Sequence, residues 1–146
     1  MVSPGSVGGD SAYVDASAII KLVVEEAESD ALRRWLVRRR VITGRIAIVE
    51  VGRAASRLGR LAASAAEQVL QAFEIVELDA GLAADAARIG PAALRSLDAI
   101  HLATALSVRS AAPVFVAYDQ RLARAAEAAG FEVVHPGLGP TTPKAS

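Results

Sequence analysis

The sequence predicts an α/β domain in which a parallel sheet of about five strands lies between two layers of helices. Short apolar runs that fit buried strands alternate along the chain with longer segments of helical periodicity. Strands that alternate with helices are joined by crossover connections, and these connections produce parallel sheets covered on both faces. A chain of 146 residues has the length of one domain with a sizeable core. We therefore expect a single three-layer α/β/α domain.

The individual elements follow from the same pattern. The expected strands are bounded by Gly, Pro or polar residues, and they cover residues 12–14, 41–43, 75–78, 114–117 and 132–135. The expected helices cover residues 17–24, 25–40, 46–58, 61–73, 80–89, 96–110 and 120–129. Ser17 is expected to cap the first of them. Residues 1–11 and 137–146 are rich in Gly, Ser and Pro, so we expect a flexible leader, a domain over 12–136 and a flexible tail.

The helix expected at 96–110 is apolar nearly all round, which is typical of a helix buried on several sides. Ser96 is a plausible N-cap and places Asp98 in the first turn, where the helix dipole favours an anion. A carboxylate that enters an apolar environment is costly unless it is paired. Taken alone, Asp98 is most simply an extra capping group, and only its relation to other acids gives it a further meaning.

Composition narrows the class of protein. Hydrophobic residues make up 53% of the chain, yet no apolar run is long enough to cross a bilayer. The chain has no cysteine and its beginning lacks the basic and apolar regions of a secretory signal, so we expect a cytoplasmic protein. The formal net charge is zero, which argues against a general polycation for nucleic acid. Arginine supplies 14 of the 16 basic residues, with runs at 33–34 and 38–40. These runs fit phosphate contacts and solvated helix faces equally well.

Four carboxylates are expected at one edge of the sheet. Asp15 follows the first strand and Asp119 follows the fourth, and ligands of such sheets bind beyond the carboxyl ends of the strands. Asp98 begins its helix nearby, and Glu50 lies in the second helical turn after the second strand. Two like charges about 4 Å apart cost roughly 4 kcal/mol at an effective dielectric near 20. Such a cluster therefore needs protonation, arginine partners or a divalent cation, and carboxylates with water are the ligands that Mg²⁺ or Mn²⁺ prefers.

Local motifs around these acids resemble the PIN-domain family, and specifically the toxin ribonucleases of VapBC-type toxin–antitoxin pairs. The resemblance extends over residues 13–136, and its most specific part is the segment 97–105. The motifs are YVDASA at 13–18, VEV at 49–51, LDAIHLATA at 97–105 and YDQRL at 118–122. The family fold is an α/β/α sandwich on a parallel sheet of about five strands, in agreement with the fold expected above.

The resemblance implies endonucleolytic cleavage of RNA that depends on Mg²⁺ or Mn²⁺, with a water activated by the metal as the attacking group. Asp15 and Asp98 match the main metal ligands, and Glu50 and Asp119 match the positions that complete the site. It also implies inhibition by a cognate antitoxin. The Ala-rich helical hairpin at 46–73 corresponds to a surface that binds partners in the family, and we expect a homodimer.

Two positions depart from the family pattern. The family often has a hydroxyl residue directly after the first Asp and another two residues before the last, and here these are Ala16 and Ala117. Ser17 remains available to hydrogen-bond Asp15 or a ligating water. The missing hydroxyls put the support of the ligands in doubt more than the ligands themselves.

Three more side chains near the acids are assigned from helical spacing. Arg53 and Arg57 follow Glu50 by three and seven residues and lie on nearly the same helix face. They are candidate contacts for RNA phosphates, although we favour an ion pair with Glu50 for Arg53. His101 lies one turn after Asp98 and is expected to be a hydrogen-bonded helix residue, since metals that prefer oxygen do not require imidazole.

Other classes of protein remain as alternatives. A phosphohydrolase of the haloacid-dehalogenase kind also uses aspartates at strand ends, but it needs a second Asp where this chain has Ser17. A phosphorelay receiver needs an acidic pair and a Lys near the sheet, whereas Lys144 lies in the tail. A PIN-fold binding module without catalysis is favoured only by Ala16 and Ala117. The residues do not select a particular RNA target.

Overall fold

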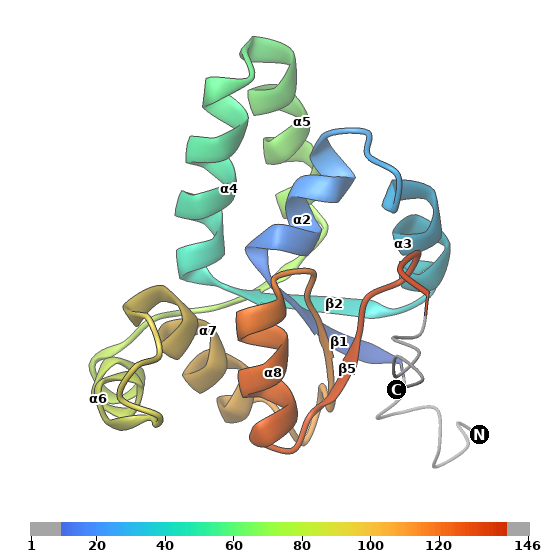
Figure 1. The fold of residues 1–146 in the computed structure, drawn as a ribbon. Helices are drawn as coiled ribbons and strands as arrows, with labels where there is room; N and C mark the ends of the chain where they lie inside the picture. Colours follow the sequence, from blue (N-terminus) through green and yellow to red (C-terminus); the bar gives the residue numbers. More distant parts are fainter. Residues whose placement is uncertain (1–9, 140–146) are drawn as a thin grey trace, which may run out of the picture.

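The structure, a computed structural model, describes residues 10–139 and contains one five-stranded parallel sheet (Figure 1). The strand order is β3-β2-β1-β4-β5, with β1 at the centre. The strands are β1 (Ser11–Val14), β2 (Arg40–Gly44), β3 (Glu74–Val76), β4 (Val114–Val116) and β5 (Glu132–Val134). Each lies within two residues of a predicted strand. The predicted sheet is therefore confirmed.

Seven helices join the strands in the described part of the chain. They are α2 (Ala16–Val23), α3 (Ser29–Leu36), α4 (Arg45–Arg57), α5 (Arg60–Gln71), α6 (Ala80–Arg88), α7 (Ser96–Ser107) and α8 (Gln120–Ala128). The helix predicted at 25–40 is shorter than expected, because Arg38 has a left-handed backbone (φ 66°) and β2 already begins at Arg40. The other predicted helices are found with boundaries that differ by up to three residues.

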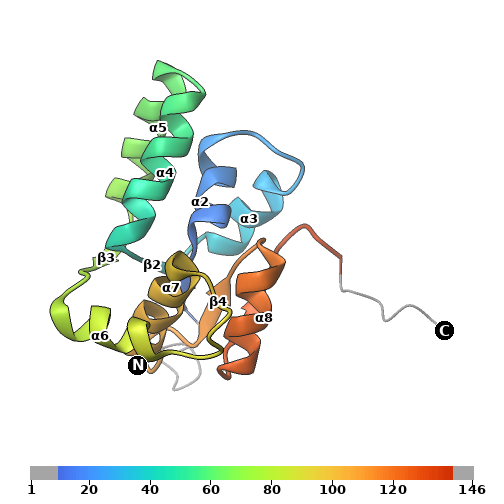
Figure 2. The ribbon, with the colours of Figure 1, turned by 60° about the vertical axis from the view of Figure 1, so that its left-hand side comes forward.

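The helices cover the sheet from both sides, with α2–α5 on one face and α6–α8 on the other (Figures 1 and 2). The side chains of β1 contribute to the core on both faces of the sheet, since successive side chains of a strand point to opposite sides. Ala12 and Val14 pack with α2–α5, whereas Tyr13 packs beneath α7 and α8 with Phe115. Tyr13 and Phe115 are fully buried and stack with ring centroids 5.2 Å apart. The three-layer architecture is the predicted one.

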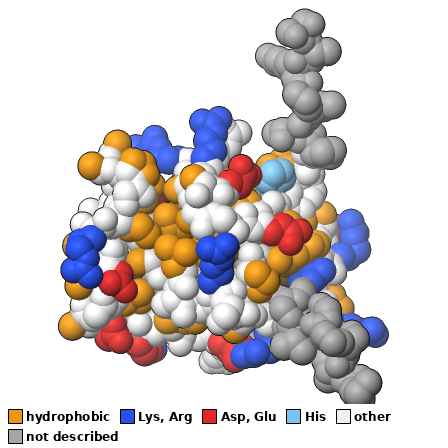
Figure 3. Space-filling model, turned by 90° about the horizontal axis from the view of Figure 1, so that it is seen from below, with side chains coloured by type: hydrophobic (Ala, Val, Ile, Leu, Met, Phe, Trp, Pro, Cys, Tyr) orange, Lys and Arg blue, Asp and Glu red, His pale blue; other side chains and the backbone are white. Residues whose placement is uncertain are grey.

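The antiparallel hairpin of α4 and α5 stands out from the sheet further than the neighbouring helices do (Figure 2). Its inner face is apolar, and Val51 and Ala55 are completely buried against the rest of the α2–α5 layer. Its outer surface keeps large hydrophobic side chains in solvent: Leu61 is 90% exposed and Leu58 is 60% exposed. By contrast, the side formed by α6–α8 shows hydrophobic areas interspersed with basic and acidic side chains (Figure 3).

The boundaries predicted for the domain need one correction. Ser11 was expected in the flexible leader, but it is the first residue of β1 and is 1% exposed. Residues 1–9 and 140–146, which make up most of the predicted leader and tail, lie outside the described residues. Among residues 10–139, no helix has both the length and the apolar character needed to span a membrane.

Candidate acidic site

Asp15 lies where β1 ends, and its side chain caps the following helix. The carboxylate oxygen Oδ1 accepts a hydrogen bond from the Ala18 N–H (3.0 Å), so Asp15 is the N-cap of α2. Ser17, which was predicted to be this cap, lies inside the helix instead. Its hydroxyl donates to the Asp15 carboxylate, at 2.7 and 2.9 Å from the two oxygens, and accepts from the Tyr118 N–H at 3.1 Å. Ser17 therefore connects the end of β1 to the chain that leaves β4.

The Asp15 carboxylate lies in an environment that disfavours its charge. The residue is only 2% exposed, and this burial raises the pKa of its carboxyl to about 6. Hydrogen bonds from Ser17 and Ala18 and the nearby His101 act in the opposite direction, and the negative charge of Asp119 adds to the rise. A carboxylate with this environment is stabilised by a cation placed beside it.

Asp98 and Asp119 approach the same edge from the N-termini of α7 and α8. Asp119 is the exposed N-cap of α8 and accepts from the Arg121 N–H at 2.9 Å. Asp98 lies in the first turn of α7, but the N-cap there is Arg95 rather than the predicted Ser96. Burial raises the pKa of Asp98, and the charge of Asp119 raises it further, while His101, Arg121 and Arg95 lower it.

The side chain of Glu50 is hydrogen-bonded to His101 and not to an arginine. Its Oε1 lies 2.5 Å from His101 Nε2, and the other ring nitrogen, Nδ1, lies 2.8 Å from the Tyr13 hydroxyl. The predicted pair of Glu50 with Arg53 is wrong, because the Glu50 carboxylate contacts His101 instead among the described residues. The prediction that His101 is a hydrogen-bonded helix residue is confirmed. Its link to Tyr13, 88 residues away, was not predicted, because no sequence spacing signals it.

The state of the His101 ring follows from the chemistry of its neighbours. Burial raises the pKa of the Tyr13 phenol above its ordinary value, so the hydroxyl keeps its proton. The Glu50 carboxylate can only accept, so Nε2 carries the proton of that contact, and the Tyr13 hydroxyl is the hydrogen-bond partner of Nδ1. Gly44 leaves room for this contact, because a Cβ at that position would lie 3.1 Å from the Tyr13 hydroxyl oxygen.

The four predicted acids thus lie at one edge of the sheet, but their carboxylates are not close enough together to coordinate one metal ion. Asp119 affects the pKa of both Asp15 and Asp98, and His101 affects these two acids while it bonds Glu50. Among the described residues, no group of three or more His, Cys, Asp or Glu side chains is arranged to hold a metal ion. The donor set of carboxylate oxygens fits Mg²⁺ or Mn²⁺ in kind, and coordination would require the carboxylates to move closer together.

The two candidate phosphate contacts on α4 lie further along the same helix. Arg53 and Arg57 are exposed and line a shallow depression together with Gly52 and Ser56. Neither guanidinium forms an ion pair among the residues that the structure describes. Both remain available to an anionic ligand.

Comparison with known proteins identifies the family. The PIN domain family model matches residues 12–128. Ribonuclease VapC35 of Mycobacterium tuberculosis strain H37Rv is 45% identical over 130 residues, which cover 86% of this chain and 96% of that protein. Ribonuclease VapC47 of strain CDC 1551 is 37% identical over 131 residues, which cover 86% of this chain and 96% of that protein. The chain belongs to the PIN-domain family, and within it to the VapC group.

A solved structure supports the same fold. The crystal structure of Mycobacterium tuberculosis VapC20, described as a toxin that cleaves the sarcin–ricin loop, superimposes with a TM-score of 0.67. The superposition covers 85% of this chain and 98% of that chain, at 23% sequence identity. At this identity the likeness concerns the fold. The predicted membership of the VapC-type PIN family, and the predicted sheet with helices on both faces, are confirmed.

Proposed function

We propose that this protein is a toxin endoribonuclease that depends on Mg²⁺ or Mn²⁺ and hydrolyses phosphodiester bonds of RNA at the edge formed by Asp15, Glu50, Asp98 and Asp119. The observation that carries the proposal is the buried Asp15, whose carboxyl pKa is raised to about 6 beside a second acid, Asp119. Such an arrangement costs stability in the free protein, and a divalent cation would relieve that cost. The family membership and the relatives named ribonucleases support the same activity.

Each acid has a distinct part in this proposal. Asp15 and Asp98 would be the main metal ligands, and Glu50 and Asp119 would complete the set directly or through water. A divalent cation, when bound, supplies an acidified water and stabilises negative charge that develops on the phosphate. Ser17 orients the Asp15 carboxylate, and the donor on His101 Nε2 orients Glu50. Arg53 and Arg57 would contact phosphates of the RNA strand along α4.

The partners in this proposal follow from the family and from the hairpin. VapC-type toxins are held inactive by cognate antitoxins, and we propose the same control here. The exposed Leu58 and Leu61 at the tip of the α4–α5 hairpin would be covered by a second copy of the chain in a homodimer. The absence of cysteine suits a reducing cytoplasm, where the RNA substrate and the antitoxin would be found.

The decisive experiment is incubation of the protein with total cellular RNA and Mg²⁺ or Mn²⁺, followed by mapping of the cut ends. Asp15→Asn and Asp98→Asn should abolish the cuts. Asp85→Asn is the matched control, because Asp85 is an exposed acid of α6 that pairs with Arg88. Cuts that persist unchanged in both site variants would refute the assigned roles.

A binding module with the PIN fold and without catalysis is the second candidate. It is favoured by Ala16 and Ala117, which replace hydroxyl residues beside the acids, and by the open arrangement of the carboxylates. Titration with Mn²⁺ separates the two candidates. A module would bind Mn²⁺ weakly and leave every RNA intact.

A further inference from the structure

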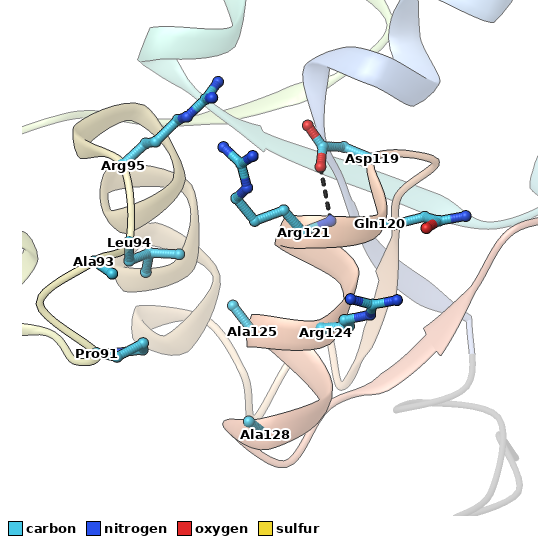
Figure 4. A pocket seen from close by; sticks show the side chains of 10 residues that line it. All are labelled: Pro91, Ala93, Leu94, Arg95, Asp119, Gln120, Arg121, Arg124, Ala125 and Ala128. Carbon is cyan, nitrogen blue, oxygen red and sulfur yellow. Dashed lines mark hydrogen bonds between the residues drawn. The ribbon is translucent and has the colours of Figure 1, made fainter.

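A cleft of about 740 Å³ opens directly beside Asp119, between α8 and the segment that leads into α7 (Figure 4). Arg95 reaches over it from the α7 side, and Arg121 reaches toward the same space from α8 (Figure 4). Its lining residues are Pro91, Ala93, Leu94, Arg95, Asp119, Gln120, Arg121, Arg124, Ala125 and Ala128. We refer to it as the arginine cleft.

The arginines of this cleft form no direct ion pairs among the described residues. Arg95, Arg121 and Arg124 are exposed, and none of their guanidinium groups forms an ion pair or hydrogen bond within the described region. Some exposed arginines elsewhere are paired with neighbouring carboxylates, as Arg40 is with Glu74, whereas Arg53 and Arg57 on α4 are not paired within residues 10–139. Other paired arginines are Arg33, Arg45 and Arg88. Asp98 and Asp119 lie near these arginines, but no carboxylate of the described region pairs directly with a guanidinium of the cleft.

This charge acts on the candidate acidic site. Arg121 and Arg95 both lower the pKa of Asp98, so their guanidinium groups lie close enough to stabilise an anion at that edge. Arg124 follows Arg121 by one helical turn and also lines the cleft, although its guanidinium extends toward the Gln120 side rather than toward Arg95 (Figure 4). The cleft thus places three cations beside the acids, two of them between α7 and α8 and one further along α8. A chain of regularly spaced anions that passes the acids fits this arrangement.

The remaining wall of the cleft is apolar and lacks aromatic rings. Leu94 and Ala125 face it, together with Pro91 and Ala128. This surface can contact sugar and base, but it offers no ring on which an unpaired base stacks. Recognition there would depend on phosphates, for which the guanidinium fork is well suited.

We propose that the arginine cleft binds single-stranded RNA, and that Arg95, Arg121 and Arg124 hold the phosphates that flank the one cleaved at the acidic site. This inference rests on the proposed function and adds the path of the strand. RNA fits better than an acidic peptide, because a substrate strand must continue past Asp119 and the cleft begins at that residue. The proposal assigns these arginines a positioning role and leaves the chemistry to the acids.

The test measures how binding of a fluorescent single-stranded RNA 20-mer depends on salt. The protein carries Asp15→Asn to prevent cleavage, and Mg²⁺ is held constant. For single strands, each phosphate contact adds about 0.7 to the slope of log affinity against log salt concentration. Arg95→Ala, Arg121→Ala and Arg124→Ala should each lower the slope by about 0.7, and the triple variant should lower it by about 2. Arg40→Ala removes the same charge at the opposite edge of the sheet and should leave the slope unchanged.

The outcomes separate this inference from the proposed function. One outcome is that the unmodified protein cleaves RNA while all three arginine variants keep an unchanged salt slope. That result would refute RNA binding by the arginine cleft and would leave the proposed nuclease activity standing. Reduced slopes without cleavage by the unmodified protein support the cleft and overturn the nuclease. If the variants keep their affinity for RNA but lose affinity for a poly-glutamate peptide, the cleft binds an acidic protein segment and the RNA proposal is wrong.

Discussion

Replacement of Tyr13 by Phe tests the buried contact that orients Glu50. The substitution keeps the ring, which is fully buried against Phe115, and removes only the hydroxyl that is hydrogen-bonded to His101 Nδ1 at 2.8 Å. His101 is 2% exposed, so water has little access to replace the lost donor. A buried polar atom left without its partner costs about 1–3 kcal/mol. We expect Tyr13→Phe to lower the free energy of unfolding by this amount.

In Tyr13→Phe, the other protonation states of the His101 ring also leave a buried nitrogen without a hydrogen-bond partner. If the proton moves from Nε2 to Nδ1, the lone pair of Nε2 faces the Glu50 carboxylate. If both nitrogens are protonated, Nδ1–H is buried without an acceptor. Each state leaves one ring nitrogen unsatisfied. The loss of stability therefore arises at the site itself, because His101 is the residue that is hydrogen-bonded to Glu50.

Urea unfolding of Tyr13→Phe and Tyr118→Phe provides a matched comparison. Tyr118 donates to the Pro136 carbonyl at 2.6 Å, but it is only partly buried, so water can replace its hydroxyl and the cost should stay below about 1 kcal/mol. In a protein that also carries His101→Leu, Tyr13→Phe should become neutral or stabilising, since no ring nitrogen remains unsatisfied. Equal costs for the two tyrosines, or an unchanged cost in the His101→Leu protein, would refute the reasoning.

Three further predictions concern the acids and the hairpin. In chelator, the metal-free protein should lose about 2 kcal/mol of stability as the pH rises from about 4 to about 7, because the raised pKa of Asp15 makes its protonated form the favoured one in the fold. Urea unfolding should show this dependence on pH in the unmodified protein and not in Asp15→Asn. Ser17→Ala leaves the Tyr118 N–H without its partner, so it should cost about 1–3 kcal/mol and raise the pKa of Asp15 further, and an unchanged carboxyl titration by NMR would contradict this. Leu61→Asp should yield a monomer in sedimentation velocity, whereas Leu138→Asp, at another exposed leucine, should leave the dimer intact.

The sheet was predictable because its pattern is local. Buried strands of three to five residues appear as apolar runs, and the turns after them contain Gly, Pro or Asp. The end of the helix predicted at 25–40 was harder to place, since Arg38 adopts a left-handed backbone without being Gly or Asn. The N-cap of α2 was misplaced by two residues, because Asp15 and Ser17 both have side chains that cap helices. Only the structure shows which one lies outside the first turn.

The contacts between the acids were less accessible from the sequence. Strand ends placed Asp15 and Asp119 at one edge, but spacing along a helix favoured Arg53 as the partner of Glu50. His101 occupies that role because α7 lies next to the start of α4 in space, across 51 residues of sequence. The arginine cleft was missed for the same reason. Arg95 and Arg121 belong to different elements, and nothing in either segment indicates that they face one another.

The capping geometry explains how the fold holds Asp15 and Asp119 at the same edge of the sheet. Asp15 and Asp119 both use Oδ1 to accept N–H groups from the helix that follows, so their side chains are fixed at positive ends of helix dipoles. Asp15 directs its other oxygen only to the Ser17 hydroxyl, and Oδ2 of Asp119 accepts no hydrogen bond among the described residues. Each cap thus uses Oδ1, and Oδ2 accepts at most the Ser17 hydroxyl among the described residues, so that it can also bind a ligand. Because the cap is needed for α2, the Asp15 carboxylate is fixed in place by the helix itself, although burial raises its pKa.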